Sequence, residues 1–500
     1  MKRLLSLILS ILLLTGCASS SDELEYVKPE INSTYYQIFV GSFSDSDGDG
    51  IGDLNGIREK LDYIQYDLGA NAIWLTPIHP SPTYHKYDVV DYYGVDEDFG
   101  TMEDFDALVD EMNERGMDLI LDLVLNHTSS RHPWFLKAVS AQLNGTCDQT
   151  PECDFYNFST TPQTGFARAG NDLYFEAVFW EGMPDLNLAN ETVRSEIQDI
   201  VGFWMDKGIK GFRLDATTHF FAENLEKNVE FLTWFNDIVK QERSDAYLVG
   251  EAWTSGSIVN RMFASGVDSF FNFDFSQQSG DIVKSIQRGQ GNALANLVVN
   301  HTDTIQSFNE GALDAVFLSN HDNNRSAGYL SVNENYQRMA ASTYLLMPGN
   351  VFIYYGEEIG MKGSGIDENK RLPMVWSTSD DAFIPNPPPN ATQTNTLEKG
   401  VKEQLEDKTS LLMHYQRVVC VRNMYPQISR ASVKVVDLGE ESIYATQMDE
   451  IIVIHNFSDD SQTVKINGIE KVTLVDGTQS HSQNELTLGG WSSVVVTITQ

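Results

Sequence analysis

Three acidic residues each follow a short apolar run of the kind that forms a buried strand. Asp215 comes directly after Gly211–Leu214, Glu251 directly after Tyr247–Gly250, and Asp322 shortly after the apolar run that ends at residue 318. In a barrel of parallel strands, the loops at the carboxyl ends converge on one mouth. Carboxylates gathered there repel one another and shift each other's pKa values, so we interpret the cluster as functional.

The types and order of these residues suit cleavage of a glycosidic bond. Double displacement needs one ionised carboxylate as nucleophile and one protonated carboxylic acid about 5–5.5 Å away. Arg213 lies two residues before Asp215, so both side chains point to one side of a strand, and the guanidinium favours an ionised Asp215. That charge raises the pKa of Glu251 and keeps it protonated. Taken alone, Arg213 and Asp215 could equally form a structural ion pair.

Further polar side chains follow other strands of the same set. Asp322 is placed to stabilise positive charge that develops on a sugar ring. We expect His127 and His321 to contact sugar hydroxyls, and the ring of Tyr87 to stack on a pyranose. Asp122 would support the site from below. The alternatives are loop contacts for the histidines and a rim position for the tyrosine.

An acidic loop follows the first apolar run. Asp45, Asp47, Asp49 and Asp53 alternate with small residues, and hard oxygen donors at this spacing suit calcium. An EF-hand would need Glu at the twelfth position, where residue 56 is Gly, and would follow a helix rather than a strand. The alternative is a solvated acidic turn.

Eight apolar runs alternate with helical patterns, which predicts an α/β fold with a (β/α)8 barrel. One helix is expected over Met102–Arg115, another through residues 193–204, and a closing helix over Lys402–Asn423. Between residues 129 and 182 the alternation stops and little helical periodicity remains, which indicates a small lobe inserted after the third strand. Beyond Pro426, short β-rich runs predict an antiparallel β-sandwich. The predicted barrel strands are Tyr36–Val40, Ala72–Thr76, Leu119–Leu125, Gly211–Leu214, Tyr247–Gly250, Ser269–Phe273, Ala315–Leu318 and Val351–Tyr355.

The predicted organisation begins with an export signal. Lys2 and Arg3 precede an apolar run to Leu14 that is shorter than the roughly 20 residues of a membrane span. The sequence around Cys17 resembles a bacterial lipoprotein box, and the alternative is an ordinary secretory signal. We therefore expect a lipid-anchored protein on the outer face of the cell membrane. The expected segments are 1–16 signal, 17–30 tether, 31–128 and 183–426 barrel, 129–182 lobe and 427–500 sandwich.

The net charge and the cysteines indicate which partners and which covalent links the protein can have. The net charge of -37 disfavours nucleic acid and anionic lipid as partners, whereas a neutral sugar is not repelled. The acidity fits simple solubility or a salty habitat. Outside the cytoplasm Cys147 and Cys153 can form a disulfide, and Cys420 lies in an apolar helical pattern as a buried thiol. We expect a monomer.

Taken together, the chain resembles the α-amylase family of glycoside hydrolases, retaining barrel enzymes that act on α-glucosidic bonds. The resemblance covers the chain after residue 31, and four segments carry it in the family's order: Asp122–His127, Gly211–His219, Glu251 and Asn320-His321-Asp322. Residues Met183–Asn187 resemble a motif intermediate between oligo-1,6-glucosidases and neopullulanases.

The resemblance assigns a role to each matching position. It implies Asp215 as nucleophile, Glu251 as general acid/base and Asp322 as transition-state stabiliser. It implies sugar contacts for Tyr87, His127, Arg213 and His321, and a Ca²⁺ site formed by Asp45, Asp47, Asp49, the carbonyl of Ile51, and Asp53. A second calcium site would use Asn126 and Asp185.

The implied activity is hydrolysis of α-1,4 bonds in starch-like α-glucans and maltooligosaccharides. Alternatives are neopullulanase, oligo-1,6-glucosidase or 4-α-glucanotransferase activity, and more remotely a non-catalytic glucan-binding homologue. Two positions depart from the pattern: Thr218 stands where many α-amylases have Lys, and Lys86 where glycine is frequent. Both leave the choice between endo and exo action open.

Overall fold

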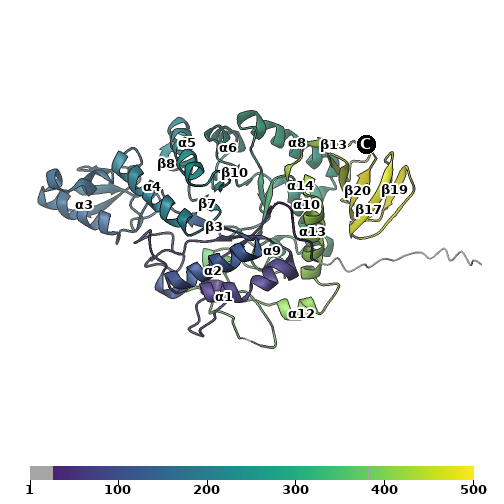
Figure 1. Cartoon of the computed structure of the whole chain (residues 1–500), viewed down its shortest axis with the longest axis horizontal. Coiled ribbons are helices and arrows are strands. Elements are labelled where there is room, and N and C mark those ends of the chain that lie inside the picture. Colours follow the sequence, from purple (N-terminus) through teal and green to yellow (C-terminus); the bar gives the residue numbers. More distant parts are fainter. Residues whose placement is uncertain (1–25, 381, 500) are drawn as a thin grey trace, which may run out of the picture.

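The computed structural model describes residues 26–380 and 382–499, and its centre is a barrel of parallel strands (Figure 1). Eight strands form one sheet in the order β10-β9-β7-β3-β2-β1-β12-β11. A parallel bridge between Phe271 and Ala315 joins the two edge strands and closes the ring. This confirms the predicted (β/α)8 fold. The strands are β1 (Thr34–Ile38), β2 (Ala72–Leu75), β3 (Asp118–Leu123), β7 (Gly211–Leu214), β9 (Tyr247–Gly250), β10 (Ser269–Phe270), β11 (Ala315–Phe317) and β12 (Asn350–Tyr354).

Alternation along each strand separates two apolar layers. Tyr35, Trp74 and Phe352 belong to a cluster that fills the barrel interior, whereas their neighbours Tyr36 and Ile73 pack outward beneath the helices. Successive strand residues point to opposite faces, so one apolar run serves both layers. A filled interior leaves the carboxyl-end mouth as the place for chemistry.

The surrounding helices follow the predicted periodicity. α2 (Met102–Arg115) has the predicted bounds, is capped by a reciprocal Thr101–Asp104 box, and ends at Gly116 in the left-handed region. α4 (Glu191–Asp206) buries the predicted apolar face. The other helices are α1 (Leu54–Glu59), α5 (Leu225–Glu242), α6 (Gly256–Met262), α7 (Asp281–Arg288), α8 (Gly291–Phe308), α9 (Ser326–Tyr329), α10 (Glu334–Leu345), α11 (Asp367–Lys370) and α14 (Gln427–Arg430), and the short strand β8 spans Phe220–Glu223.

The inserted segment contains a helix that the sequence analysis missed. α3 (Pro133–Asn144) begins at a His132 cap and precedes the sheet β4-β6-β5, formed by β4 (Phe158–Ser159), β6 (Leu173–Glu176) and β5 (Phe166–Gly170). Leu136 and Leu143 of α3 are exposed, which blurs its amphipathic pattern. A disulfide joins Cys147 to Cys153, as predicted.

The C-terminal strands form two antiparallel sheets at the opposite end of the molecule from the inserted lobe (Figure 1). Two of these strands have no β-rich run to predict them: β18 is three polar residues, and β19 has only two apolar residues. The predicted helix Lys402–Asn423 is also wrong: it is two helices, α12 (Val401–Leu405) and α13 (Leu411–Met424), because Ser410 caps a new helix start. The strands are β13 (Val433–Val435), β14 (Ile443–Met448), β15 (Ile451–Asn456), β16 (Gln462–Lys465), β17 (Ile469–Asp476), β18 (Gln479–His481), β19 (Glu485–Leu488) and β20 (Ser493–Ile498).

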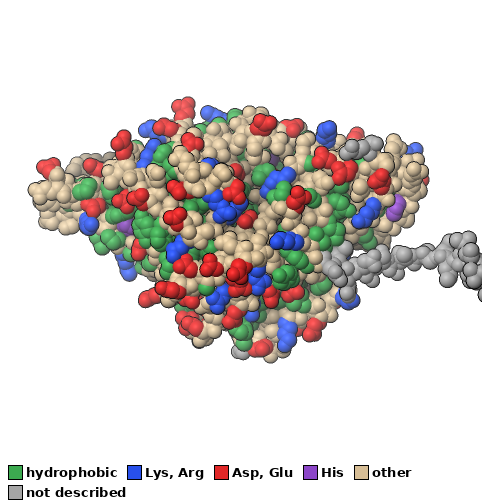
Figure 2. Space-filling view, in the orientation of Figure 1, with side chains coloured by type: hydrophobic (Ala, Val, Ile, Leu, Met, Phe, Trp, Pro, Cys, Tyr) green, Lys and Arg blue, Asp and Glu red, His purple; other side chains and the backbone are tan. Residues whose placement is uncertain are grey.

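The start of the described chain already contacts the barrel. The Tyr26 hydroxyl donates to Asn71, and the Asn423 amide donates to the carbonyl of Val27. The predicted signal and Cys17 lie outside the described residues. Within those residues, no helix combines the length and apolarity that a bilayer crossing requires. Acidic side chains are spread over the face in Figure 2, interspersed with Lys and Arg.

Candidate active site

Arg213 is the centre of the carboxylate cluster at the barrel mouth. On β7 its side chain is 1% exposed, and its Nη1 lies 2.7 Å from Asp215 and 2.8 Å from Asp122. Its Nη2 lies 3.2 Å from Glu251 Oε2. The neighbouring strands β3, β7 and β9 supply these residues, because parallel register brings their carboxyl ends level. The structure therefore brings Asp215 and Glu251 together on one guanidinium, with Asp122 beneath them.

A second group surrounds Asp322 on the loop after β11. His321 Nε2 lies 3.0 Å from Asp322 Oδ2 and 2.7 Å from the Tyr87 hydroxyl. Gln37 donates to His321 Nδ1 at 2.8 Å, so the proton of the neutral imidazole sits on Nε2. The Tyr87 hydroxyl in turn donates to Asp122. A continuous hydrogen-bond chain thus links the two groups.

Arg371 also fixes Asp322, and the sequence analysis missed it. Its Nη2 lies 2.8 Å from Asp322 Oδ1, its Nε donates to the carbonyl of His321, and its Nη1 donates to the Tyr84 hydroxyl. Arg371 follows α11, in a loop without a strand or periodic pattern to mark it. Gln37 was missed because it reads as an ordinary strand residue. The pairing of β1 and β11 with the late strand β12 brings it next to His321.

Burial and the shared charges shift the pKa values of this cluster in opposite directions. Burial raises the pKa of Glu251 to about 8; Arg213 opposes the rise, and Asp215 and Asp322 add to it. Burial likewise raises the pKa of Asp122 to about 7 against the pull of Arg213. Burial would raise the pKa of Asp322 too, but His321 and the guanidinium groups lower it overall. The cluster therefore separates a protonated acid from an ionised carboxylate.

The two histidines are neutral and face different neighbours. Burial lowers the pKa of His321 to about 3 despite Asp322 beside it, and burial also lowers the pKa of His127. His127 Nε2 is buried and has no hydrogen-bond partner among the described residues. A buried polar atom without a partner is costly, so His127 is ready to bond a ligand hydroxyl. Phe179 of the inserted lobe packs edge-on against its ring.

The acidic loop after β1 draws three carboxylates together. Oxygens of Asp45, Asp47 and Asp49 can lie within 4.8 Å of one another. Asp53, also predicted as a ligand, lies outside this group of three and caps α1, where its carboxylate accepts from the backbone N–H groups of Gly56 and Ser46. The converging donors are hard oxygens, the kind that calcium prefers, so the three aspartates fit such an ion.

Comparison with known proteins agrees with this geometry. Residues 37–431 match the family model "Alpha amylase, catalytic domain", and residues 443–495 match "Alpha-amylase SusG C-terminal domain". The first match covers well over half of the chain. The chain belongs to the α-amylase family of glycoside hydrolases.

Individual relatives of this family match the chain along nearly its whole length. Alpha-amylase 3 of Dictyoglomus thermophilum is 36% identical, and the match covers 93% of each chain. The solved structure of Eubacterium rectale Amy13B has a TM-score of 0.90 and 38% identity, covering 95% of this chain and 97% of that one. The Glucan 1,6-alpha-glucosidase of Streptococcus pneumoniae is 30% identical over 89% of this chain and 95% of its own.

The structure explains one departure from the family pattern. Lys86 has φ 64°, in the left-handed region that favours glycine. Its ammonium group is buried and lies 2.9 Å from Asp96 and 2.8 Å from Asp98. These ion pairs offset the unfavourable backbone conformation. Lys86 therefore stabilises the loop that carries Tyr87. Thr218, the other departure, contacts the ring of its neighbour His219.

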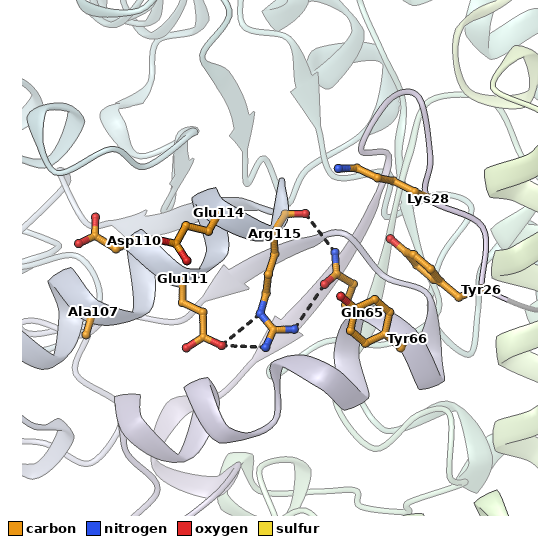
Figure 3. Close-up of a pocket in the computed structure, with 9 residues that line it drawn as sticks. All are labelled: Tyr26, Lys28, Gln65, Tyr66, Ala107, Asp110, Glu111, Glu114 and Arg115. Atoms are coloured by element: carbon orange, nitrogen blue, oxygen red, sulfur yellow. Dashed lines mark hydrogen bonds and ion pairs between the residues drawn. The ribbon is translucent and has the colours of Figure 1, made fainter.

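Two other regions are candidate binding sites: the predicted second calcium site and a hollow at the opposite end of the strands. The Asn126 amide donates to Asp185 Oδ1 at 3.1 Å, so in this family member the two predicted ligands of a second calcium bond each other. A hollow of about 660 Å³ lies away from the catalytic mouth, where Gln65 and Arg115 precede β2 and β3 (Figure 3). There Arg115 is neutralised by Glu111 at 2.8 Å. This hollow contains none of the predicted site residues.

Proposed function

We propose that this enzyme hydrolyses α-1,4-glucosidic bonds of starch, related glucans and maltooligosaccharides with retention of anomeric configuration. The observation that carries the proposal is the contact of one buried guanidinium, Arg213, with both Asp215 and Glu251. The Arg213 guanidinium holds the nucleophile and the acid close together at the barrel mouth, and double displacement requires such a pair.

The first step transfers the sugar to the protein. Arg213 binds Asp215 Oδ1, so the other carboxylate oxygen attacks the anomeric carbon as the bond to the leaving glucose breaks. Glu251 gives its proton to the leaving oxygen, for which its raised pKa suits it. Asp322, held ionised by Arg371, stabilises the positive charge that develops on the ring. The product is a glycosyl ester of Asp215.

The second step returns both groups to their starting state. Glu251, now ionised, takes a proton from a water molecule, and the oxygen of that water attacks the anomeric carbon. The ester bond to Asp215 breaks and the sugar leaves with its original configuration. His127, His321, Tyr87 and Arg213 line the same place. The unpartnered Nε2 of His127 gives the clearest support for a contact with a sugar hydroxyl.

A second specificity has support among the relatives. The Streptococcus pneumoniae relative is named for action on 1,6 bonds, and oligo-1,6-glucosidases are also similar to this chain. Neopullulanase or 4-α-glucanotransferase activity would use the same two steps, because transfer differs from hydrolysis only in the acceptor. We place α-1,4 hydrolysis first because the relative named Alpha-amylase 3 matches 93% of the chain and residues 37–431 match an alpha-amylase catalytic-domain model.

Calcium at the loop after β1 is part of the proposal. Asp45, Asp47, Asp49, the carbonyl of Ile51 and Asp53 would hold the ion; Asp45, Asp47 and Asp49 already converge, and Asp53 adjoins them from the start of α1. A bound cation there would neutralise repulsion between the carboxylates and tie the loop together. We assign it a structural role.

Location and assembly complete the proposal. The lipoprotein-like sequence around Cys17 supports export and a lipid anchor on the outer face of the cell membrane, with the enzyme acting at the cell surface as a monomer. Replacing Cys17 with Ser should release the enzyme from the membrane fraction.

Product analysis tests the reaction. The purified enzyme is incubated with a maltooligosaccharide series, pullulan and isomaltose; chromatography identifies the products, and proton NMR follows the newly formed anomer. We expect cleavage of the maltooligosaccharides with the α anomer appearing first. Initial release of the β anomer, or cleavage of isomaltose alone, would contradict the proposal.

A further inference from the structure

Two adjacent carboxylates outside the catalytic cluster are buried just after β12. Glu357 is 2% exposed and Glu358 is fully buried. Burying a carboxylate costs several kcal/mol unless it is well hydrogen-bonded. Here hydroxyl groups serve that purpose, and they come from β1, from the loop after β11 and from nearby helices; β1 and β11 are the two strands that flank β12 in the sheet. The mechanism above uses neither residue.

The hydrogen bonds of Glu357 connect rigid helices to the loop after β11. Its Oε1 accepts from the hydroxyls of Tyr344 at 2.8 Å and Tyr415 at 3.0 Å, which belong to α10 and α13. Its Oε2 accepts from the Ser319 hydroxyl at 2.9 Å. Burial raises the pKa of Glu357 to about 7, although all three hydroxyls favour its ionised form. One carboxylate thus ties Ser319 to two helices.

Ser319 begins the segment that carries the catalytic loop residues. Asn320, His321 and Asp322 follow it directly, and the Asn320 side chain accepts from the Asp322 backbone N–H at 2.9 Å. Arg371 and His321 orient the Asp322 carboxylate, but the place where the loop leaves β11 is set at Ser319. A misplacement of about 1 Å at a reacting group can cost roughly 100-fold in rate.

Glu358 has a different set of contacts. Its Oε1 accepts from the Tyr36 hydroxyl at 2.6 Å and the Tyr63 hydroxyl at 2.7 Å, on the side of β1 and the segment after α1. These partners lie outside the loop that begins at Ser319. Both bonds fall on Oε1, and Oε2 has no hydrogen-bond partner among the described residues, so a glutamine at residue 358 can keep both bonds through its amide oxygen. Glu358→Gln is therefore a control for a neighbouring buried carboxylate whose bonds do not reach Ser319.

We propose that Glu357 is a positioning residue, which acts through Ser319 to hold the loop bearing Asp322 in its catalytic place. The inference rests on the proposed glycosidase function. A glutamine at residue 357 keeps the size of the side chain but replaces one acceptor oxygen with an NH2 donor, so it cannot accept hydroxyls at both ends. Ser319→Ala removes the link from the other side with little change in volume.

A double-mutant cycle with full-length enzyme tests the link. Glu357→Gln and Ser319→Ala should each lower kcat on a defined maltooligosaccharide about tenfold with KM within about twofold, because the loss is in transition-state stabilisation. The double variant should be no slower than the slower single variant. Glu358→Gln should keep kcat within about twofold.

Each outcome bears on the inference. Wild-type kcat in Ser319→Ala, multiplying losses in the double variant, or an equal loss of kcat in Glu358→Gln would overturn it. If Glu357→Gln does not fold, Ser319→Ala measured against Glu358→Gln decides the question. A wild-type enzyme inert on every α-glucan would overturn the proposed function and this inference together. An active wild type with an unaffected Ser319→Ala would overturn the inference alone.

Discussion

The pKa of Glu251 predicts where activity is lost as the pH rises. Burial raises that pKa to about 8, and the charges of Asp215 and Asp322 act in the same direction. The proposed first step needs the protonated form, which is present below pH 8 and disappears above it. At pH 9 about one tenth of Glu251 is still protonated, so kcat/KM should be about tenfold lower than at pH 7, and tenfold lower again at pH 10.

The assay compares two substrates and two variants. On a maltooligosaccharide, kcat/KM of the wild type should decline on the basic side with a midpoint near pH 8. An aryl maltooligoside with an acidic phenol as leaving group needs little acid assistance, so its basic decline should be shallower. Asp322→Asn removes a negative charge that raises the pKa of Glu251, so the midpoint of its residual activity should move to lower pH.

Glu251→Gln provides the control for this assignment. The amide cannot lose a proton in this range, so the basic decline should vanish on the aryl substrate. Hydrolysis of the maltooligosaccharide should be lost almost entirely. If the decline stays at the same pH in Glu251→Gln, or the wild type holds constant kcat/KM to pH 10, the reasoning from burial and neighbouring charge is wrong.

Three further predictions concern the nucleophile, the metal loop and the lobe. Asp215→Asn should lower turnover by about 10⁴-fold or more with an unchanged circular dichroism spectrum, and normal activity would contradict the assigned nucleophile. Calcium at about 100 times its Kd adds about 2.7 kcal/mol to the free energy of unfolding, so a chelator should lower the melting temperature of the wild type but not that of Asp47→Asn/Asp49→Asn; equal shifts would contradict the site. Replacing Cys147 and Cys153 with serine should speed proteolysis of the lobe while kcat is retained. The lobe should lose less stability than the roughly 3 kcal/mol that a disulfide closing a 15-residue loop contributes, because these cysteines are only six positions apart. Unchanged proteolysis would show that the disulfide does not stabilise the lobe.

The barrel could be predicted because its signals are local. Strands buried on both faces form continuous apolar runs. The helix Met102–Arg115 is predicted by the spacing of its apolar residues and by its capping residues. The failures occurred where local signals are weak. α3 has leucines on its exposed face, and β19 alternates a buried residue with a polar one over only four positions. The break before α13 lies in the polar stretch 406–410, where Ser410 caps the new helix, and such a stretch is equally compatible with the exposed face of one continuous helix.

The same reasoning separates the predictable part of the site from the rest. Asp215, Glu251 and Asp322 could be proposed because each follows its own strand, and the barrel guarantees that strand ends meet. Arg371 and Gln37 could not, since their importance comes only from contacts made across the closed barrel. One cation touching three carboxylates cannot neutralise them all, and the pKa is raised at Glu251 and Asp122. The acid and the nucleophile therefore differ through their surroundings in three dimensions, and no spacing in the sequence encodes that difference.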